Sequence, residues 1–141
     1  MPAVADRFTT EVRVRFAETD AQGIVHNSVY LVWFELARVE YLERHAGGYP
    51  MLREQGIESF VTESRVRYLE PAHFDERLTI RTSCRDVRGA RFRFVYEIDR
   101  DGTRIAEGET AHACVDAVTH RATRVPAWLV EAIARAEGSK G

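Results

Sequence analysis

The stretch SVYLVWFELARVEYLERH, residues 28–45, is the most aromatic part of the chain and predicts one long helix. Its apolar side chains recur at helical intervals, so that several of them share one face. These residues are Tyr30, Trp33, Phe34, Ala37 and Tyr41, with Val32, Leu36 and Val39 beside them. Because the first half of the helix is apolar nearly all round, we expect it to be covered on most sides and to form the centre of the core.

Chain breakers and charged residues define the rest of this helix. Gly47, Gly48 and Pro50 predict its end. Glu35 precedes Arg38 by three residues, a spacing that predicts a salt bridge on the helix surface.

The chain on either side of the helix predicts β-strands. Residues 8–16 alternate between apolar and polar side chains, which predicts a half-buried strand, and the loop 17–27 joins it to the helix. Four further strands are predicted after the helix, at residues 59–69, 77–87, 91–99 and 103–118. Turn signals separate them, so consecutive hairpins would form an antiparallel sheet. A short amphipathic helix, residues 126–136, completes the pattern.

This order of elements predicts an α+β fold, with an antiparallel five-stranded sheet curled around a long central helix. A chain of 141 residues with 45% hydrophobic residues has enough apolar material for one core. No internal repeat or low-complexity tract divides it. We therefore expect a single domain over residues 1–141.

Charge and cysteine content limit the classes of function. Twenty basic and 22 acidic residues give a net charge of -2, which argues against general binding to nucleic acid or to an anionic membrane. Cys84 and Cys114 lack the C-x-x-C spacing of metal and redox sites, so we expect both to be reduced core residues. No apolar leader or long apolar window is present, which predicts a soluble cytoplasmic protein. We expect neither a metal ion nor a cofactor.

The common nucleophile, phosphate and dinucleotide motifs are missing from this sequence. It contains no G-x-S-x-G, no G-x-x-x-x-G-K-[ST], no G-x-G-x-x-G and no H-E-x-x-H. His112 and Cys114 lie two residues apart on one predicted strand, which separates them by roughly 7 Å and is too far for one to activate the other. We interpret both as buried core side chains.

The stretch TDAQGIVHNSVY, residues 19–30, places a carboxylate just before the start of the long helix. Backbone N–H groups at a helix N-terminus carry partial positive charge, so the first turn near His26, Asn27 and Ser28 is a candidate oxyanion site. Asp20 beside it could attack a carbonyl or activate water. The alternative is structural: Asp20 forms an Asx-turn, and Asn27 or Ser28 caps the helix.

Two stretches resemble a known family. RFAETDAQGIVHNSVYLVWFELARVEYL, residues 15–42, and VRYLEPAHFDERL, residues 66–78, are similar to the hotdog-fold acyl-CoA thioesterases of the 4-hydroxybenzoyl-CoA thioesterase-like group. The resemblance covers most of the chain and implies hydrolysis of an acyl-CoA to free acid and CoA. It also implies a homodimer or homotetramer.

The resemblance further assigns roles to individual residues. Asp20 falls on the family's catalytic carboxylate, which acts as nucleophile or general base according to subgroup. The segment from Val25 to Ser28 falls on the backbone N–H groups that bind the thioester oxygen. Several relatives place His or Tyr seven residues after the aspartate, whereas this chain has Asn27 there and His26 one residue earlier. Both are therefore candidates for a role in catalysis.

Arginines crowd one predicted hairpin, around the turn Arg88-Gly89. In the 4-hydroxybenzoyl-CoA thioesterase the similar hairpin carries basic residues that bind phosphate. Arg88 is the closest positional match, and Arg91 flanks the same turn. Arg85 and Arg93 could instead belong to a solvated strand face. We expect Arg88 and Arg91 to bind the phosphates of CoA.

Two other classes of function are compatible with the same fold. A hotdog enoyl-CoA hydratase or dehydratase would use an Asp and a His, but such enzymes resemble D-x-N-P-x-H, with the two residues five apart. Here Asp20 and His26 are six apart and no Asn-Pro lies between them. A non-catalytic acyl-CoA-binding module is the second alternative, and an aspartate in the catalytic position argues against it.

Overall fold

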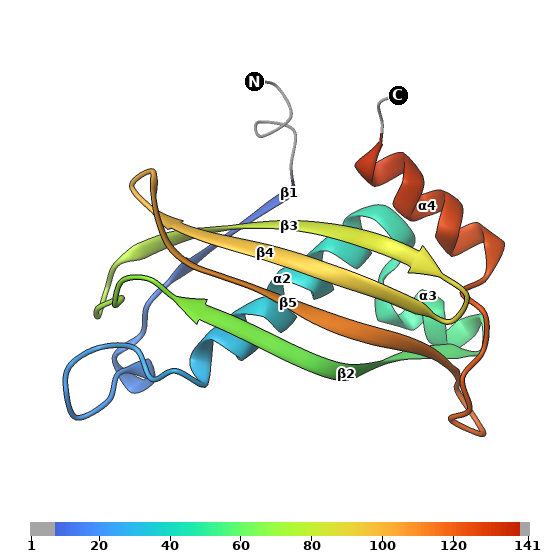
Figure 1. Cartoon of the computed structure of the whole chain (residues 1–141), viewed down its shortest axis with the longest axis horizontal. Coiled ribbons are helices and arrows are strands. Elements are labelled where there is room, and N and C mark those ends of the chain that lie inside the picture. Colours follow the sequence, from blue (N-terminus) through green and yellow to red (C-terminus); the bar gives the residue numbers. More distant parts are fainter. Residues whose placement is uncertain (1–7, 139–141) are drawn as a thin grey trace.

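The long helix packs across one face of a curved antiparallel sheet, as seen in a computed structural model that describes residues 8–138 (Figure 1). The elements are, in order, β1 (Phe8–Arg13), the 3-10 helix η1 (Phe16–Glu18), α2 (Val29–Ala46), α3 (Gly48–Glu54), β2 (Ile57–Tyr68), β3 (Arg77–Arg88), β4 (Arg91–Arg100), β5 (Thr103–Asp116) and α4 (Ala127–Glu137). The strand order in the sheet is β1-β3-β4-β5-β2, and every neighbouring pair is antiparallel.

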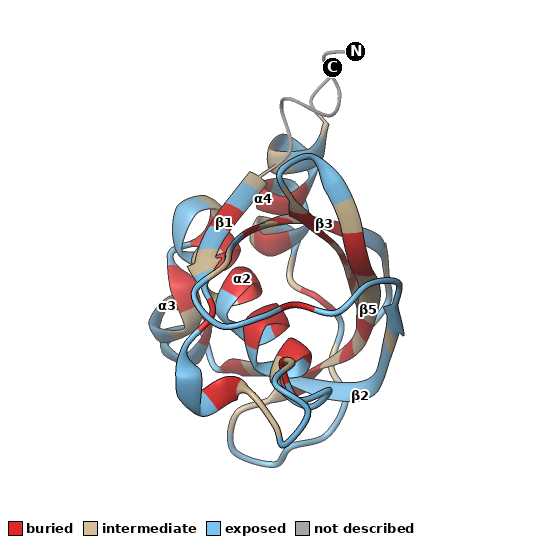
Figure 2. Cartoon of the chain, turned by 90° about the vertical axis from the view of Figure 1, so that its left-hand side faces the viewer, coloured by how far each residue is buried: buried red, intermediate tan, exposed pale blue. Residues whose placement is uncertain are grey.

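The sheet curls around α2, which lies at the centre of the molecule when it is viewed from one end (Figure 2). The strands β3, β4 and β5 follow one another in sequence and in space, so two hairpins form the middle of the sheet. The strands β1 and β2 occupy its two edges. The prediction of a five-stranded antiparallel sheet around a long central helix is confirmed.

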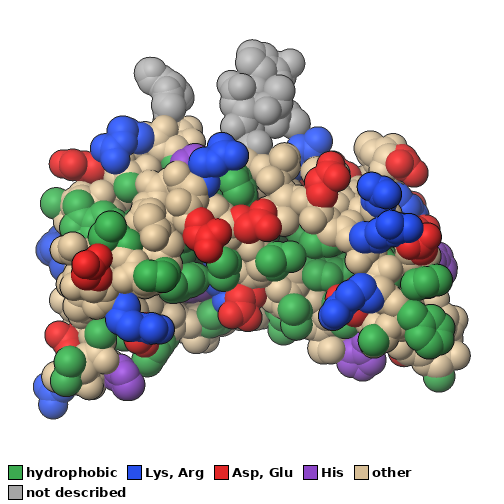
Figure 3. All heavy atoms as spheres, turned by 180° about the vertical axis from the view of Figure 1, so that it is seen from behind, with side chains coloured by type: hydrophobic (Ala, Val, Ile, Leu, Met, Phe, Trp, Pro, Cys, Tyr) green, Lys and Arg blue, Asp and Glu red, His purple; other side chains and the backbone are tan. Residues whose placement is uncertain are grey.

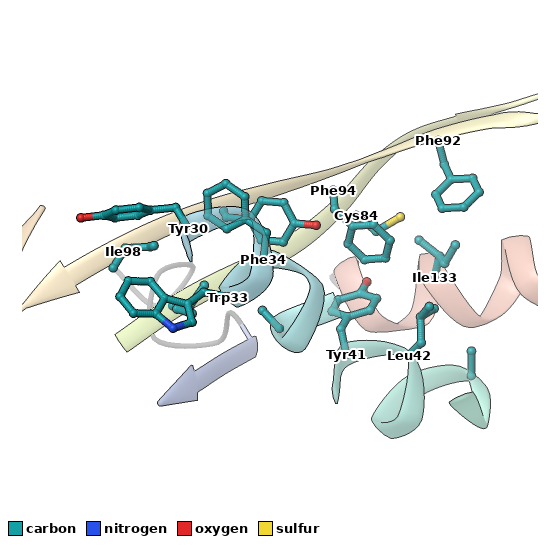
Figure 4. Close-up of a cluster of buried hydrophobic side chains, with 14 of the residues drawn as sticks. Tyr30, Trp33, Phe34, Tyr41, Leu42, Cys84, Phe92, Phe94, Ile98 and Ile133 are labelled. Carbon is teal, nitrogen blue, oxygen red and sulfur yellow. The ribbon is translucent and has the colours of Figure 1, made fainter. Parts of the chain in front are cut away.

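The buried face of α2 is the predicted one. Tyr30, Trp33, Phe34, Ala37 and Tyr41 are each at most 3% exposed. Phe34 stacks on Tyr96 and Tyr41 meets Phe94 edge to face, and both partners lie in β4 (Figure 4). This face of the helix is the centre of the core, as expected from the helical spacing of its apolar residues.

The Phe34 ring of α2 packs directly against Gly108 in β5. Phe34 stacks on Tyr96 with 4.1 Å between ring centroids and 5° between ring planes. A Cβ atom at position 108 would lie 2.6 Å from the Phe34 ring and 2.4 Å from the Arg65 carbonyl oxygen. No real side chain tolerates such contacts, so only glycine lets the helix lie this close.

The C-terminal helix packs on the core through Leu129 and Ile133, and one carboxylate fixes its end. Glu137 at the end of α4 accepts a 2.5 Å hydrogen bond from the Tyr41 hydroxyl and a 2.9 Å bond from the Cys84 backbone N–H. Burial raises the pKa of the Cys84 thiol and of the Cys114 thiol, so both stay protonated. Both cysteines are free and buried, as predicted.

Two elements differ from the sequence prediction. The first strand ends at Arg13 rather than at residue 16, because the Glu18 carboxylate accepts the Arg15 backbone N–H at 2.8 Å and turns the chain into η1. Phe16 consequently leaves the sheet and is 73% exposed. After α2, Gly47 adopts a left-handed conformation that ends the helix as predicted. The chain then forms the unpredicted helix α3, whose Leu52 is buried in the core.

The outer side of α2 is less covered than the sequence predicts. Val32 is 59% exposed and Leu36 is 40% exposed. Hydrophobic side chains gather in patches between charged ones on the face shown in Figure 3. The sheet covers one side of the helix, and Val32 and Leu36 on the outer side have no full cover within residues 8–138.

The predicted salt bridge between Glu35 and Arg38 does not form among the described residues. Arg38 is only 8% exposed and points inwards, where its Nη1 donates to the Tyr96 hydroxyl at 3.3 Å. Glu35 lies on the exposed side of the helix. The prediction was wrong because spacing along a helix does not show which of its charged side chains turns towards the core.

A buried chain of polar side chains crosses the core beside Arg38. The Tyr96 hydroxyl shares a hydrogen bond of 2.8 Å with Thr110, and Thr110 lies 2.8 Å from Nε2 of His112. Nδ1 of His112 lies 3.0 Å from the Ser59 hydroxyl. Burial and the positive charge of Arg38 lower the pKa of His112 from 6.5 to about 3, so its imidazole is neutral in the folded protein. His112 is thus a core residue, as predicted.

The buried histidine predicts acid sensitivity. His112 has a folded pKa of about 3 and an unfolded value of 6.5, so the unfolded state binds an extra proton between these values. The contribution of neutral His112 to the free energy of unfolding is complete above pH 6.5 and is lost as the pH falls towards 3. One such site contributes a slope of up to about 1.4 kcal/mol per pH unit. We expect His112→Gln to reduce this slope, measured by urea unfolding at a series of pH values.

The matched control is His120→Gln, because His120 is exposed. It should leave the pH dependence of the wild type unchanged. An equal slope for wild type and His112→Gln would show that His112 does not cause the acid sensitivity.

Candidate active site

The loop before α2 holds the Asp20 carboxylate in a fixed turn. Its Oδ1 accepts the backbone N–H of Gln22 at 2.8 Å and, more weakly, that of Ile24 at 3.4 Å. Gly23 completes the turn with a φ of 82°, and its N–H donates to the Asp20 carbonyl. The expected Asx-turn is therefore present. Oδ2 of Asp20 has no hydrogen bond within residues 8–138 and remains available to a ligand.

The residues just before Asp20 anchor this loop to the start of the helix. The Glu18 carbonyl accepts the His26 N–H at 2.9 Å, and Thr19 and Val25 form an isolated β-bridge. Glu18 itself is buried, with its carboxylate engaged by Arg15. The loop is thus closed at its base by backbone hydrogen bonds, and its tip, residues 21–23, is exposed.

The second family-like stretch, residues 66–78, lies directly beside this loop. The Ala72 carbonyl accepts the Val25 N–H at 2.9 Å, and Ile24 forms a β-bridge with His73. The Tyr68 hydroxyl donates to the Asn27 carbonyl at 2.9 Å. These contacts explain why the two stretches belong to one motif, since each supplies the backbone partners of the other.

Arg100 fixes the far wall of the site. Its guanidinium donates to the Pro71 carbonyl at 2.9 Å and to the carboxylates of Glu70 and Glu76 at 3.0 Å. These contacts keep the segment after β2 against the end of β4. The position of this wall is therefore fixed by a strand residue as well as by loop residues.

Asp20 lies in a cleft of about 460 Å³ at this end of the molecule. The lining residues are Asp20, Gln22, Ile24, Val25, His26, Asn27, Tyr30, Tyr68, Leu69, Glu70 and Pro71. The structure thus brings together four of the residues predicted for the site. Ser28 does not line the cleft, although its hydroxyl lies 2.8 Å from Nδ1 of His26.

Two tyrosines in the cleft were not predicted as site residues. The rings of Tyr30 and Tyr68 meet edge to face, with centroids 5.0 Å apart. Tyr30 was interpreted only as a core residue of the helix. Tyr68 is part of the stretch VRYLEP, whose resemblance to the family was the one sequence signal that could have placed it here.

The backbone N–H groups from Val25 to Ser28 are not equally available. Val25 donates to Ala72, and His26 donates to Glu18. The Ser28 N–H donates to Nδ1 of His26 at 3.1 Å. Only the Asn27 N–H has no acceptor within the described residues. The predicted oxyanion site therefore narrows to the N–H of Asn27.

His26 is oriented by local contacts. Because its Nδ1 accepts the Ser28 N–H, the proton of the neutral ring lies on Nε2. No hydrogen bond joins His26 to Asp20 in the part of the chain that the structure describes. Ser28 is the residue before the first helical position, but its side chain makes no capping hydrogen bond. Its hydroxyl contacts His26 instead.

The arginines predicted to bind phosphate lie at the other end of the sheet. The turn between β3 and β4 is remote from the Asp20 loop, as the labelled strands of Figure 1 show. Arg88 and Arg91 line a separate cavity of about 730 Å³ and make no ion pair within residues 8–138. Arg93 is bound by Asp86 and Glu109. One chain thus does not bring Arg88 and Arg91 to the cleft.

The described residues contain no group of three or more His, Cys, Asp and Glu side chains that could hold a metal ion. None of the helices within residues 8–138 has the length and apolar character to cross a membrane.

The cleft combines two groups with complementary chemistry. A carboxylate oxygen that has no internal partner can act as a nucleophile or a general base. An unpaired backbone N–H at the start of a long helix can stabilise negative charge on an oxygen. Both line one cavity that is open to solvent. This is the arrangement required to attack a carbonyl compound.

Comparison with known proteins identifies the family. A model described as the thioesterase-like superfamily matches residues 14–133. The acyl-CoA thioester hydrolase YbgC of Escherichia coli is 31% identical over 87% of this chain and 92% of its own length. These matches confirm the prediction of a thioester hydrolase.

Solved structures agree with this result. A Thermus thermophilus protein is 36% identical, with a TM-score of 0.84 over 90% of this chain and 97% of its own. The DHNA-CoA thioesterase of Staphylococcus aureus is 30% identical, with a TM-score of 0.82 over 90% of this chain and 88% of its own. The chain therefore belongs to the thioesterase-like superfamily and has its hotdog fold.

Proposed function

We propose that this thioesterase hydrolyses an acyl-CoA to free acid and CoA, with Asp20 as the catalytic carboxylate. The observation that carries the proposal is the placement of Asp20 and Asn27 in one cleft, with a free carboxylate oxygen on one and a free N–H on the other. The thioester carbonyl oxygen would accept the Asn27 N–H, and its carbon would face Asp20. The names of the similar proteins support an acyl-CoA as the substrate.

The reaction requires little beyond these groups. With Asp20 as general base, a water oxygen attacks the carbonyl carbon while its proton passes to the carboxylate. The carbonyl oxygen gains negative charge, which the Asn27 N–H stabilises. The carbon–sulfur bond then breaks, and the thiolate of CoA takes a proton. With Asp20 as nucleophile, the same steps pass through an anhydride that water hydrolyses.

His26 has a supporting role in this proposal. With Nδ1 accepting from Ser28, its Nε2–H can donate to a group in the cleft, such as the departing sulfur. The missing hydrogen bond between His26 and Asp20 argues against the paired acid and base of a hydratase. An acyl-CoA-binding module without catalysis would not need the free oxygen of Asp20. The cytoplasmic location remains a prediction.

The carboxylate can be tested by replacing Asp20 with its neutral isostere. We expect Asp20→Asn to lower kcat on the best acyl-CoA by roughly 10²-fold or more, because the base or nucleophile is lost. The measurement is release of free thiol from a panel of acyl-CoA substrates.

Asp101→Asn is the matched control, since Asp101 lies in the turn between β4 and β5 and does not line the cleft. It should retain wild-type turnover. Near wild-type turnover by a folded Asp20→Asn protein would contradict the mechanism. Tight binding of acyl-CoA with equal, slow turnover by wild type and Asp20→Asn would instead support a binding module.

A second copy of the chain is part of the proposal. The edge strand β2 is 12 residues long and largely exposed, and it lies beside the uncovered side of α2. An exposed edge of this length needs a cover, and pairing with a second copy supplies one. We therefore infer at least a homodimer, paired through β2 and the outer side of α2. A homotetramer would add a further contact between dimers.

Assembly can be measured directly. We expect light scattering at micromolar concentration to give the mass of at least two chains. Val32→Glu should shift the mass towards that of one chain, because it buries a charge on the uncovered side of α2. The control is Val118→Glu, a highly exposed position in the turn after β5. A fully active monomeric wild type would refute this part of the proposal.

Two-fold pairing also explains the position of Arg88 and Arg91. Antiparallel pairing of β2 with its copy reverses the second sheet, so that its β3–β4 turn lies at the end where the first chain has Asp20 (Figure 1). The CoA phosphates of one site would then meet the arginines of the other copy. Bidentate contacts of this kind strengthen binding rather than the chemical step.

The phosphate contacts should therefore appear in KM. We expect Arg88→Ala combined with Arg91→Ala to raise KM for acyl-CoA several-fold with little change in kcat, and added salt should reduce the difference. A short thioester without the nucleotide should be hydrolysed equally by both proteins. Arg53→Ala, which removes an exposed arginine of α3, serves as the control. Equal KM values for acyl-CoA in wild type and the double variant at low salt would show that other residues bind the phosphates.

A further inference from the structure

Arg38 is a buried cation without a carboxylate partner among the described residues. It is 8% exposed, and its Nε is fully enclosed and has no hydrogen-bond partner. Its nearest polar neighbours are the hydroxyls of Tyr96 and Tyr49, which are neutral. A buried charge is costly unless it is paired, so a group that pairs with Arg38 should be part of the functional state.

Arg38 opens onto a cavity that is distinct from the Asp20 cleft. This second cavity has a volume of about 540 Å³ and is lined by Glu35, Arg38, Val39, Tyr49, Ser59, Phe60 and Val61. Four of its seven lining residues are apolar or aromatic, and the guanidinium supplies hydrogen-bond donors. A pocket of this kind suits an apolar ligand that ends in an anionic group.

The two cavities follow the same seam between α2 and β2. The Asp20 cleft contains Tyr30 near the start of α2 and Tyr68 at the end of β2. The second cavity contains Arg38 further along α2 and Ser59 near the start of β2. Because α2 and β2 run in opposite directions, the end of β2 lies beside the start of α2, and the start of β2 lies beside the later part of α2 (Figure 1). A ligand extended along the seam would reach from one cavity to the other.

The separation of the cavities fits an acyl group of medium length. The helical rise is about 1.5 Å per residue, so Asn27 and Arg38 are separated by about 16 Å along the helix axis. Helical side chains lean towards the N-terminus, which brings the guanidinium nearer by roughly one turn, about 5 Å. An acyl chain whose thioester is at Asn27 thus needs a length of roughly 11 Å to contact Arg38.

We propose that the acyl group of the substrate ends in a carboxylate, which Arg38 binds in the cavity between α2 and β2. This inference rests on the proposed function, because it places the thioester at Asp20. The planar guanidinium of Arg38 offers paired N–H groups in the geometry that matches two carboxylate oxygens. Glu35 lines the same cavity and repels the ligand, so its charge limits the affinity.

The test compares octanedioyl mono-CoA with octanoyl-CoA, which differ only in the terminal carboxylate. We expect wild type to have a kcat/KM at least roughly 10-fold higher for the dicarboxylic substrate, the scale of a charged hydrogen bond. Arg38→Met should abolish this preference by lowering kcat/KM for the dicarboxylic substrate. Glu35→Gln should increase the preference. Hexanedioyl and decanedioyl mono-CoA test the predicted length.

Two further variants keep the test decisive. Arg44→Met removes an arginine from the same helix that lines neither cavity, and it should keep the wild-type preference. Arg38→Lys retains the charge without the fork and should keep part of the preference, which covers the case that Arg38→Met does not fold.

The outcomes separate this inference from the proposed function. Hydrolysis of both substrates by wild type without preference would overturn the role of Arg38 and leave the thioesterase proposal intact. If Arg38→Met no longer forms the oligomer but keeps the preference, Arg38 pairs with an acid of the second copy. That result would also overturn its role in substrate binding and leave the thioesterase proposal intact. Absence of thiol release from every acyl-CoA would refute the proposed function and, with it, this inference.

Discussion

The stacking of Phe34 on Tyr96 above Gly108 is the contact on which the other features depend. It sets how close α2 lies to the sheet, because any side chain at position 108 would displace the helix. A helix held at this distance has its first turn beside the end of β2, where the Tyr68 hydroxyl meets the Asn27 carbonyl. The packing of the core thus positions the N–H group to which we assign the oxyanion role.

The candidate site is built mainly from backbone hydrogen bonds. The carbonyls of Glu18 and Ala72 hold the loop at His26 and Val25. Two backbone N–H groups orient one oxygen of Asp20 and leave the other free. Such a loop tolerates many side chains at its exposed tip, provided that its turn and its base are kept. The Asx-turn and the catalytic role, which the sequence presents as alternatives, are therefore compatible.

Burial without an ion pair distinguishes Arg38 from the other arginines of the chain that the structure describes. On the outer face of the sheet, Arg104 contacts the carboxylates of Asp99, Glu97 and Glu107, and other arginines make similar pairs there. Arg38, by contrast, makes no ion pair within residues 8–138. Several exposed arginines, among them Arg88 and Arg91, also make no ion pair within residues 8–138. Burial is therefore what distinguishes Arg38, because a buried charge without a partner is costly.

The sequence by itself determined the central helix, its buried face and the antiparallel sheet, because periodic burial leaves a local pattern in the chain. It also indicated Asp20, through a motif whose parts are close in sequence. Only the tertiary structure decided that Ala72 binds the Val25 N–H and that Tyr68 lies in the cleft, since both contacts join residues more than forty positions apart. The same reason applies to Arg38. Its neighbours on a helix suggest a surface salt bridge, whereas the sheet around it decides that its charge is buried.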